Sequence, residues 1–221
     1  TMTTFDEVSS VLGVLGTIAF AITGVLAVAE RRVDFFSAVV LGVITAVGGG
    51  TIRDLIMDVP VFWSLDLSYI RIAVMASIVT FFALSFMKHA PIFKTILLAD
   101  ALGISLFGVG GAMKAYELGF ALPVGALIMG VITAIGGGLI RDVLTGRKTL
   151  LMSDEVYAVP VALGCVCLLS LLRFFPEYPT VALICGTVLA FSLRTAAVLW
   201  ALRLPAWFTT ERLDTRSFRY S

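Results

Sequence analysis

Two copies of a short apolar stretch, each ending in Arg-Asp, contain the side chains of this sequence that could do chemistry. The copies occupy residues 42–54 and 130–142, and eleven of their thirteen positions are identical at a spacing of 88 residues. Each copy has three consecutive glycines, two further residues and then the arginine and aspartate. So long a match between distant parts of one chain predicts an internal duplication.

The glycine triplets predict a local break in each helix, because every glycine in a helix interior costs about 1 kcal/mol. A half-helix that ends at a break presents carbonyl groups to a cation, and one that begins there presents N–H groups to an anion. In lipid such a break must be packed in protein or line a watery cavity. The alternative is close helix packing through small residues. The glycines are Gly48, Gly49, Gly50, Gly136, Gly137 and Gly138.

Charged residues within the apolar segments form two groups, because each half of the membrane must satisfy its own charges. At 1.5 Å per residue, Arg53 and Asp142 lie about 13 Å apart along the membrane axis, so we expect no pairing between them. We expect Arg194 to have Asp100 or Asp142 as its neighbour. We expect Arg53 and Asp54 to have different partners, because adjacent helical residues do not face each other. The outer group is Arg53, Asp54 and Lys114, and the inner group is Asp100, Arg141, Asp142 and Arg194.

Several of these residues have two interpretations. Lys114 has no charged counterpart, since the matching position is Ala27, so it is either a gate residue or a lysine that extends to the outer interface. Thr45 and Thr133, one turn before the glycines, either line a pore or bond back to their own helix.

The two arginines and two tyrosines at matching positions complete the set. Arg53 and Arg141 either form static ion pairs or make a charged constriction beside a pathway. Tyr69 and Tyr157, near the ends of predicted spans, are expected to anchor the membrane interface.

The composition places these segments in a bilayer. The 221 residues are 59% hydrophobic and 14% charged, with a mean hydropathy of +1.03, more apolar surface than one soluble domain could bury. A net charge of +1 without a basic block excludes a nucleic-acid partner. The sequence shows no enzyme-like constellation and no dedicated metal site, and we expect no cofactor.

Seven stretches are long enough to cross about 30 Å of hydrocarbon as helices. Three fall in each 88-residue period, and an odd number of spans makes the second copy enter the membrane from the opposite side, so we expect inverted repeats. With a one-residue slip, Gly16 of the first span aligns with Gly103 of the fourth. The predicted fold is an all-α integral membrane protein. Its spans are 8–29, 35–59, 68–87, 95–116, 118–144, 156–172 and 178–202, with repeat one at about 8–87, repeat two at about 95–172 and the seventh helix at about 178–202.

The basic residues predict the orientation. Ten lysines and arginines flank the spans on one side and three on the other, which places the N-terminus outside and the C-terminus in the cytoplasm. We expect residues 1–207 to form a single transmembrane domain and 208–221 a short cytoplasmic tail.

With two Gly-Gly-Gly-x-Ile-Arg-Asp stretches, inverted three-helix repeats and a seventh helix, residues 8–203 resemble the trimeric intracellular cation channel family. More narrowly, they resemble its prokaryotic members, which share the repeated domain of the bacterial glycine-transporter family. The resemblance implies a homotrimer in the lipid of a prokaryotic inner membrane, with an hourglass pathway in each protomer gated near kinks at the glycine triplets. Of the basic Lys-Glu-Val stretch that animal members carry in the fourth helix, Lys114 alone matches.

Three functions follow as expectations. The first is a channel for monovalent cations, permeable to potassium with limited discrimination over sodium, because the breaks offer carbonyls to a transient cation without a charged cage. The second is a transporter of glycine or small amino acids, in which a helix N-terminus with Arg53 or Arg141 holds the carboxylate. The third is a membrane assembly protein without a pathway.

Overall fold

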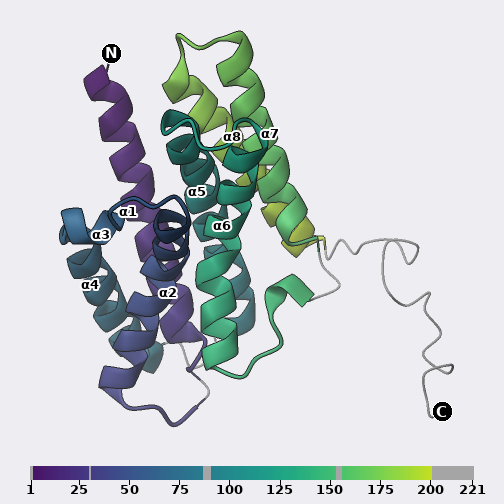
Figure 1. Cartoon of the computed structure of the whole chain (residues 1–221). Helices are drawn as coiled ribbons and strands as arrows, with labels where there is room; N and C mark the ends of the chain where they lie inside the picture. The colour runs from purple at the N-terminus through teal and green to yellow at the C-terminus, as the bar shows by residue number, and fades with distance from the viewer. Residues whose placement is uncertain (1, 30, 87–90, 153–155, 201–221) are drawn as a thin grey trace, which may run out of the picture.

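The computed structural model describes residues 2–29, 31–86, 91–152 and 156–200, and within these ranges all regular structure is helical (Figure 1). The predicted tail at 208–221, residues 201–202 of the seventh predicted span and Met87 of the third lie outside the described residues. The helices are α1 (Met2–Leu26), α2 (Phe35–Ile56), α3 (Phe62–Leu65), α4 (Ser68–Ala83), η1 (Leu84–Phe86), α5 (Ile92–Glu117), α6 (Val124–Leu144), η2 (Leu150–Met152), α7 (Ala158–Phe174) and α8 (Pro179–Leu199).

Within the described ranges, five helices are long and apolar enough to span a bilayer: α1, α2, α5, α6 and α8. The other two predicted spans correspond to α4 and α7, which are apolar but have 16 and 17 residues. A full crossing needs about 20 residues of straight helix. The assignment to the all-helical membrane proteins therefore rests on five helices. Helices α4 and α7 are too short for their length alone to show that they cross the membrane.

Local signals explain where the helices begin and end. The Asp34 carboxylate caps α2 by accepting hydrogen bonds from the Ser37 hydroxyl and backbone N–H, and these bonds hold the pKa of Asp34 below its usual value. The fifth span begins later than predicted, at Val124 and not at Leu118. After α5, the chain turns through Gly119 with a positive φ of 67°, and α6 follows Pro123.

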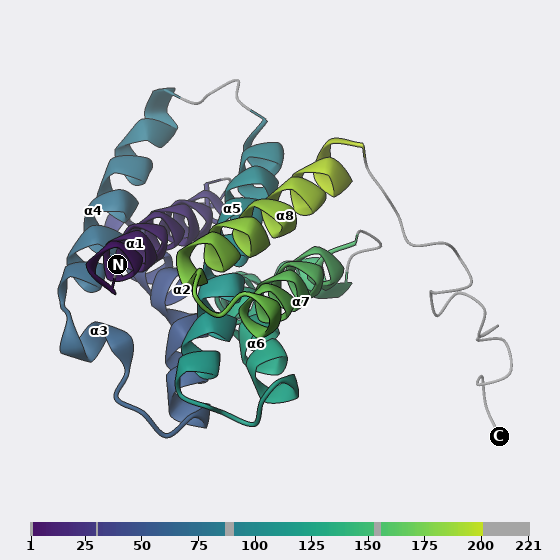
Figure 2. The same cartoon turned by 90° about the horizontal axis from the view of Figure 1, so that it is seen from above.

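The helices pack in two groups of similar make-up. Helices α1, α2 and α4 contact one another, as do α5, α6 and α7, while α8 packs on α7 and α5. The groups meet where α1 lies against α5 and α2 against α6. Seen from above, α4 and α7 lie on opposite sides of the bundle (Figure 2). Helices at matching places in the two sequence copies therefore face each other at the centre.

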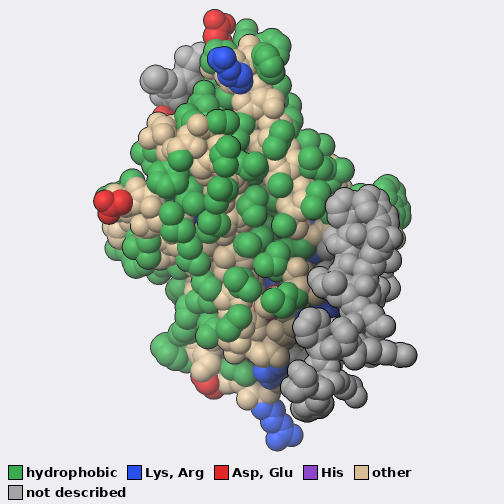
Figure 3. All heavy atoms as spheres, turned by 45° about the vertical axis from the view of Figure 1, so that its right-hand side comes forward, with side chains coloured by type: hydrophobic (Ala, Val, Ile, Leu, Met, Phe, Trp, Pro, Cys, Tyr) green, Lys and Arg blue, Asp and Glu red, His purple; other side chains and the backbone are tan. Residues whose placement is uncertain are grey.

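Apolar side chains cover the exterior of the bundle. In the view of Figure 3 they are spread over the whole face, with charged side chains at its top and bottom and one acidic group on its left edge. Large exposed residues include Phe36, Val79 and Val143, at 73%, 62% and 64% exposure. Such a surface suits lipid contact.

Candidate functional site

The glycine triplets do not break their helices. Helix α2 is continuous through Gly48, Gly49 and Gly50, and α6 is continuous through its own triplet, so the prediction of half-helices with exposed backbone is wrong. A continuous helix keeps its backbone groups hydrogen-bonded within the segment, as lipid requires. Close helix contact compensates for the cost of the glycines.

The first two glycines of each triplet instead lie at the crossing of α2 and α6. A Cβ on Gly49 would overlap the Thr133 carbonyl oxygen, and a Cβ on Gly137 would overlap the Thr45 carbonyl oxygen. A Cβ on Gly136 would lie 3.0 Å from the Gly49 Cα. The contacts are reciprocal, and each pair of matching residues is 88 apart. The small-residue packing alternative therefore describes Gly48, Gly49, Gly136 and Gly137, whereas Gly50 lies against the Phe62 ring and Gly138 against Tyr157, Asp100 and Arg141.

The threonines before the triplets bond back to their own helices. The Thr45 hydroxyl donates to the Leu41 carbonyl at 2.7 Å, and the Thr133 hydroxyl donates to the Met129 carbonyl. Both threonines are fully buried. Of the two interpretations considered for these residues, the structure shows the local bond.

Asp54 is the centre of the outer cluster, which we define as Arg53, Asp54 and Lys114; outer and inner are named for the predicted orientation. Its carboxylate accepts hydrogen bonds from Arg53 Nε, Lys114 Nζ and the Phe62 backbone N–H, each at 2.8 Å. Asp54 is fully buried, whereas the Lys114 side chain is 31% exposed. The outer cluster contains two cations and one carboxylate.

Arg141 is the centre of the inner cluster, which we define as Asp100, Arg141 and Asp142. Arg141 Nε donates to Asp142 and Arg141 Nη1 to Asp100, both at 2.8 Å. The second Asp142 oxygen accepts the Leu150 backbone N–H at 3.1 Å. Within the described ranges, the buried atoms Asp100 Oδ2 and Arg141 Nη2 have no hydrogen-bond partner. This cluster, with one cation and two carboxylates, retains hydrogen-bonding capacity.

The two clusters have the same arrangement of arginine, aspartate and backbone N–H, and they differ in the charged residue that α5 contributes. In each, an arginine bonds the next aspartate, and that aspartate accepts the backbone N–H eight residues further on. The prediction that Arg53 and Asp54 have different partners is therefore wrong. The arginine side chain is long enough to place Nε on its neighbour's carboxylate. Helix α5 adds Lys114 to the outer cluster and Asp100 to the inner cluster.

Arg194 does not pair with either predicted carboxylate. Its Nη1 donates to the Val156 carbonyl at 3.0 Å, and its guanidinium lies 4.9 Å from the centre of the Tyr157 ring. Asp100 and Asp142 bond Arg141 instead. Tyr157 is only 5% exposed, so the prediction of an interface anchor is also wrong for this residue. A long cation is stabilised here by an aromatic face and a carbonyl.

A cavity of about 290 Å³ lies beside the outer cluster. We call it the outer cavity. Arg53 and Lys114 contribute cations to its wall, Glu117 a carboxylate and Tyr69 a hydroxyl-bearing ring. Phe107 of α5 also lines it. The glycine triplets do not, so the cavity, and not the triplets, offers the solvent-accessible polar surface in this part of the molecule.

Two kinds of participant escaped the sequence analysis. The backbone N–H groups of Phe62 and Leu150 could not be recognised from the sequence, because every residue except proline has a backbone N–H group. Phe107, at the cavity wall, has a detectable signal: the register that aligns Gly16 with Gly103 also aligns Phe20 with Phe107.

A family model described as glycine transporter matches residues 10–85 and 97–173. The inner membrane protein YadS of Escherichia coli (strain K12) is 38% identical over 201 residues, covering 90% of this chain and 96% of that protein. The membrane protein YvgT of Bacillus subtilis is 40% identical over 156 residues, covering 69% of this chain and 75% of that protein.

Solved structures match over nearly their whole length. The trimeric intracellular cation channel orthologue from Rhodobacter sphaeroides has 36% identity and a TM-score of 0.82, covering 88% of this chain and 99% of that one. A prokaryotic channel of the same kind, crystallised in 0.5 M KCl, has 30% identity and a TM-score of 0.82, covering 90% and 99%.

Proposed function

Because this chain belongs to the glycine transporter family and, within it, is related to the prokaryotic trimeric intracellular cation channels, we propose that it is a cation channel of a prokaryotic inner membrane. One observation carries the proposal. The fold matches a channel of that kind over 99% of the channel's length, at a TM-score of 0.82 and 36% identity. The permeating ions are potassium and sodium, with limited discrimination between them.

The polar groups of the bundle support a pathway along α5 within each protomer. The outer cavity and the outer cluster lie at one end of this helix, and the inner cluster lies at the other. The inner cluster has an excess of carboxylate, and Asp100 Oδ2 is a spare acceptor for a passing cation. Conduction needs weak sites that an ion can leave, not a dedicated cage.

The glycine triplets enter the proposal as a pivot. At their crossing, α2 and α6 touch backbone to backbone at Gly49 and Gly137, and around this point the Ile140 side chain packs on Gly48 and the Ile52 side chain lies near Gly136. Gating then involves movement of α2 against α6 about Gly49 and Gly137. This role replaces the exposed backbone expected from sequence.

The assembly and topology are part of the same proposal. We infer a homotrimer surrounded by lipid, with two inverted three-helix repeats and α8 outside them, so that α4 and α7 also cross the membrane. The pairing of α1 with α5 and of α2 with α6 supports the inverted repeats, as does the match of one family model to two segments of the chain.

The proposed orientation places the N-terminus outside and makes opposite predictions for two exposed loop positions. Lys148, after α6, is expected in the cytoplasm, and Glu177, between α7 and α8, outside. In a variant whose native cysteines are replaced by serine, Glu177→Cys should react with an impermeant maleimide in right-side-out vesicles. Lys148→Cys should react only in inverted vesicles. The reverse pattern would overturn the orientation.

Ion flux through purified protein tests the channel itself. Vesicles loaded with potassium and diluted into a potassium-free medium should develop a membrane potential, reported by a voltage-sensitive dye, only when they contain the protein. The potential should be smaller when both the inside and the outside of the vesicles also contain sodium, at the concentration that potassium has inside, because the channel discriminates little between the two ions. Vesicles that respond to valinomycin but not to the protein would contradict the proposal.

A second candidate function is transport of glycine. The family description names it, and the outer cavity offers Arg53 and Lys114 to a carboxylate and Glu117 to an ammonium group. Counterflow distinguishes it: labelled glycine should accumulate in vesicles preloaded with unlabelled glycine if the protein is a carrier. The channel proposal predicts no such exchange.

Neutralising Lys114 should increase cation conductance. Lys114→Gln removes a cation from the cavity wall and leaves Asp54 bonded to Arg53 and the Phe62 N–H. We expect the unitary potassium conductance to rise by about a fewfold, since charges in a narrow cleft set the local ion concentration. The matched control is Lys94→Gln, which removes the same charge from an exposed position on the same helix. Equal conductance in both variants would show that Lys114 does not face the ion.

A further inference from the structure

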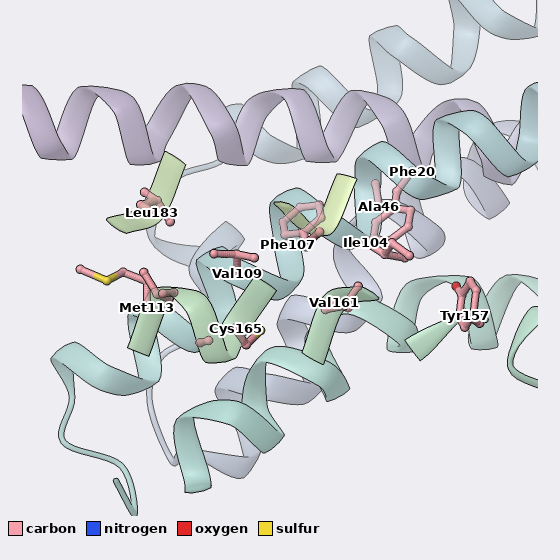
Figure 4. Packing of buried hydrophobic residues seen from close by; sticks show 14 of the residues in the cluster. Phe20, Ala46, Ile104, Phe107, Val109, Met113, Tyr157, Val161, Cys165 and Leu183 are labelled. Carbon is pink, nitrogen blue, oxygen red and sulfur yellow. The ribbon is translucent and has the colours of Figure 1, made fainter. Parts of the chain in front are cut away.

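A pair of stacked phenylalanines lies beside the outer cavity, and one of them, Phe107, forms part of its wall. Phe20 of α1 and Phe107 of α5 stack with ring centres 5.6 Å apart and planes within 6° of parallel. Phe20 is 1% exposed and Phe107 is 7% exposed, and Phe107 forms part of the cavity wall. In Figure 4 the pair lies between Met113, which lines the cavity, and Tyr157, which belongs to the inner end.

Each ring sits on a glycine of the opposite helix. A Cβ on Gly103 of α5 would lie 2.7 Å from Phe20 Cδ1, and a Cβ on Gly16 of α1 would lie 3.0 Å from Phe107 Cδ2. Each phenylalanine lies four residues beyond the glycine of its own helix, and both pairs are 87 residues apart. The contact of Phe20 with Gly103 is therefore equivalent to the contact of Phe107 with Gly16, and the two rings meet where the two sequence copies pack together.

The spacing along α5 places this ring pair between the charged clusters. Asp100, Phe107 and Lys114 follow one another at intervals of seven residues, which is close to two helical turns, so they share one face of α5. At 1.5 Å per residue, Phe107 lies about 10 Å from the Cα of each charged residue. The face changes from polar to apolar and back to polar.

We propose that the stacked Phe20 and Phe107 rings are the hydrophobic gate of the pathway, which rests on the proposed function as a cation channel. An ion moving along α5 must pass between the two clusters, and there it meets two buried rings that offer no replacement for its hydration shell. An apolar constriction of this kind blocks ions by excluding water. Opening requires the rings to separate, and each ring faces a glycine of the opposite helix instead of a larger side chain.

Potassium flux through polar variants tests the gate. Phe107→Asn and Phe20→Asn should raise resting flux in the vesicle assay by roughly tenfold, because a polar side chain lets water fill the constriction. Phe107→Leu keeps the site apolar and should raise flux much less than Phe107→Asn. The control is Phe81→Asn. Phe81 of α4 forms another aromatic pair, with Phe35 of α2, and its replacement should leave flux unchanged.

A second variant covers failure of the asparagine variants to fold. Gly103→Ala displaces the Phe20 ring without adding polarity and should also raise flux. If the asparagine variants fold and they and Gly103→Ala all retain wild-type flux, the proposed gate is wrong, but the proposal of a cation channel is not affected. Absence of flux from the wild type and from every gate variant would overturn the proposed function.

Discussion

Gly49→Ala is expected to force α2 away from α6 and to destabilise the protein by at least about 1–3 kcal/mol, the cost of overpacking a close-packed site. The added Cβ would overlap the Thr133 carbonyl oxygen, and a backbone atom cannot rotate away as a side chain can. Gly137→Ala should behave alike, because its Cβ would overlap the Thr45 carbonyl oxygen. The measurement is the unfolding temperature of the purified protein in detergent.

Gly110→Ala is the matched control for stability. Gly110 also lies within a helix, but no atom lies within 4 Å of a Cβ placed there. Alanine should therefore stabilise this position by up to about 1 kcal/mol, through helix propensity alone. If Gly49→Ala and Gly110→Ala shifted the unfolding temperature equally, the close crossing of α2 and α6 would be refuted.

Removal of Arg141 should have the other large effect. Arg141→Met leaves Asp100 and Asp142 buried without their shared cation, and breaking a buried ion pair in this way costs about 3–5 kcal/mol. Arg147→Met is the control, because Arg147 donates to a backbone carbonyl, that of Ala27, and is only partly buried. Its loss should lower the unfolding temperature much less.

A second substitution tests whether Arg141 stabilises the protein through its ion pair with Asp100. Adding Asp100→Asn to Arg141→Met removes one of the two uncompensated carboxylates, so the double variant should recover part of the lost stability. Interaction between neighbouring sites of this kind appears as non-additivity in a double-mutant cycle. Strictly additive losses would mean that Arg141 does not act through Asp100.

The sequence predicted the helices well and the glycines poorly, for related reasons. Apolar length dictates where a helix can lie in a bilayer, and that information is local. Whether a triplet such as Gly48–Gly50 breaks a helix depends on what packs against it, and the approach of α6 is a tertiary fact. The reciprocal overlaps at Gly49 and Gly137 show the compensation that no local rule contains.

The charged groups show the same division. The cost of a charge in lipid was enough to group Lys114 with Asp54 and Asp100 with Arg141, but the partner it predicted for Arg194 was wrong, because Asp100 and Asp142 bond Arg141. The rule that adjacent residues diverge failed at Arg53 because it describes Cβ directions and ignores the reach of a guanidinium. The Tyr157 ring beneath Arg194 was assigned to the membrane surface because its position in the chain, at the end of a span, is the same for an anchor and for a buried ring.

Single-channel recording of the purified wild-type protein in a planar bilayer is the most direct test of the claim that this chain conducts cations. With a potassium chloride gradient and glycine in neither chamber, we predict unitary current steps whose reversal potential lies close to the equilibrium potential of potassium. A silent bilayer, with saturable glycine exchange in vesicles made from the same preparation, would contradict the account.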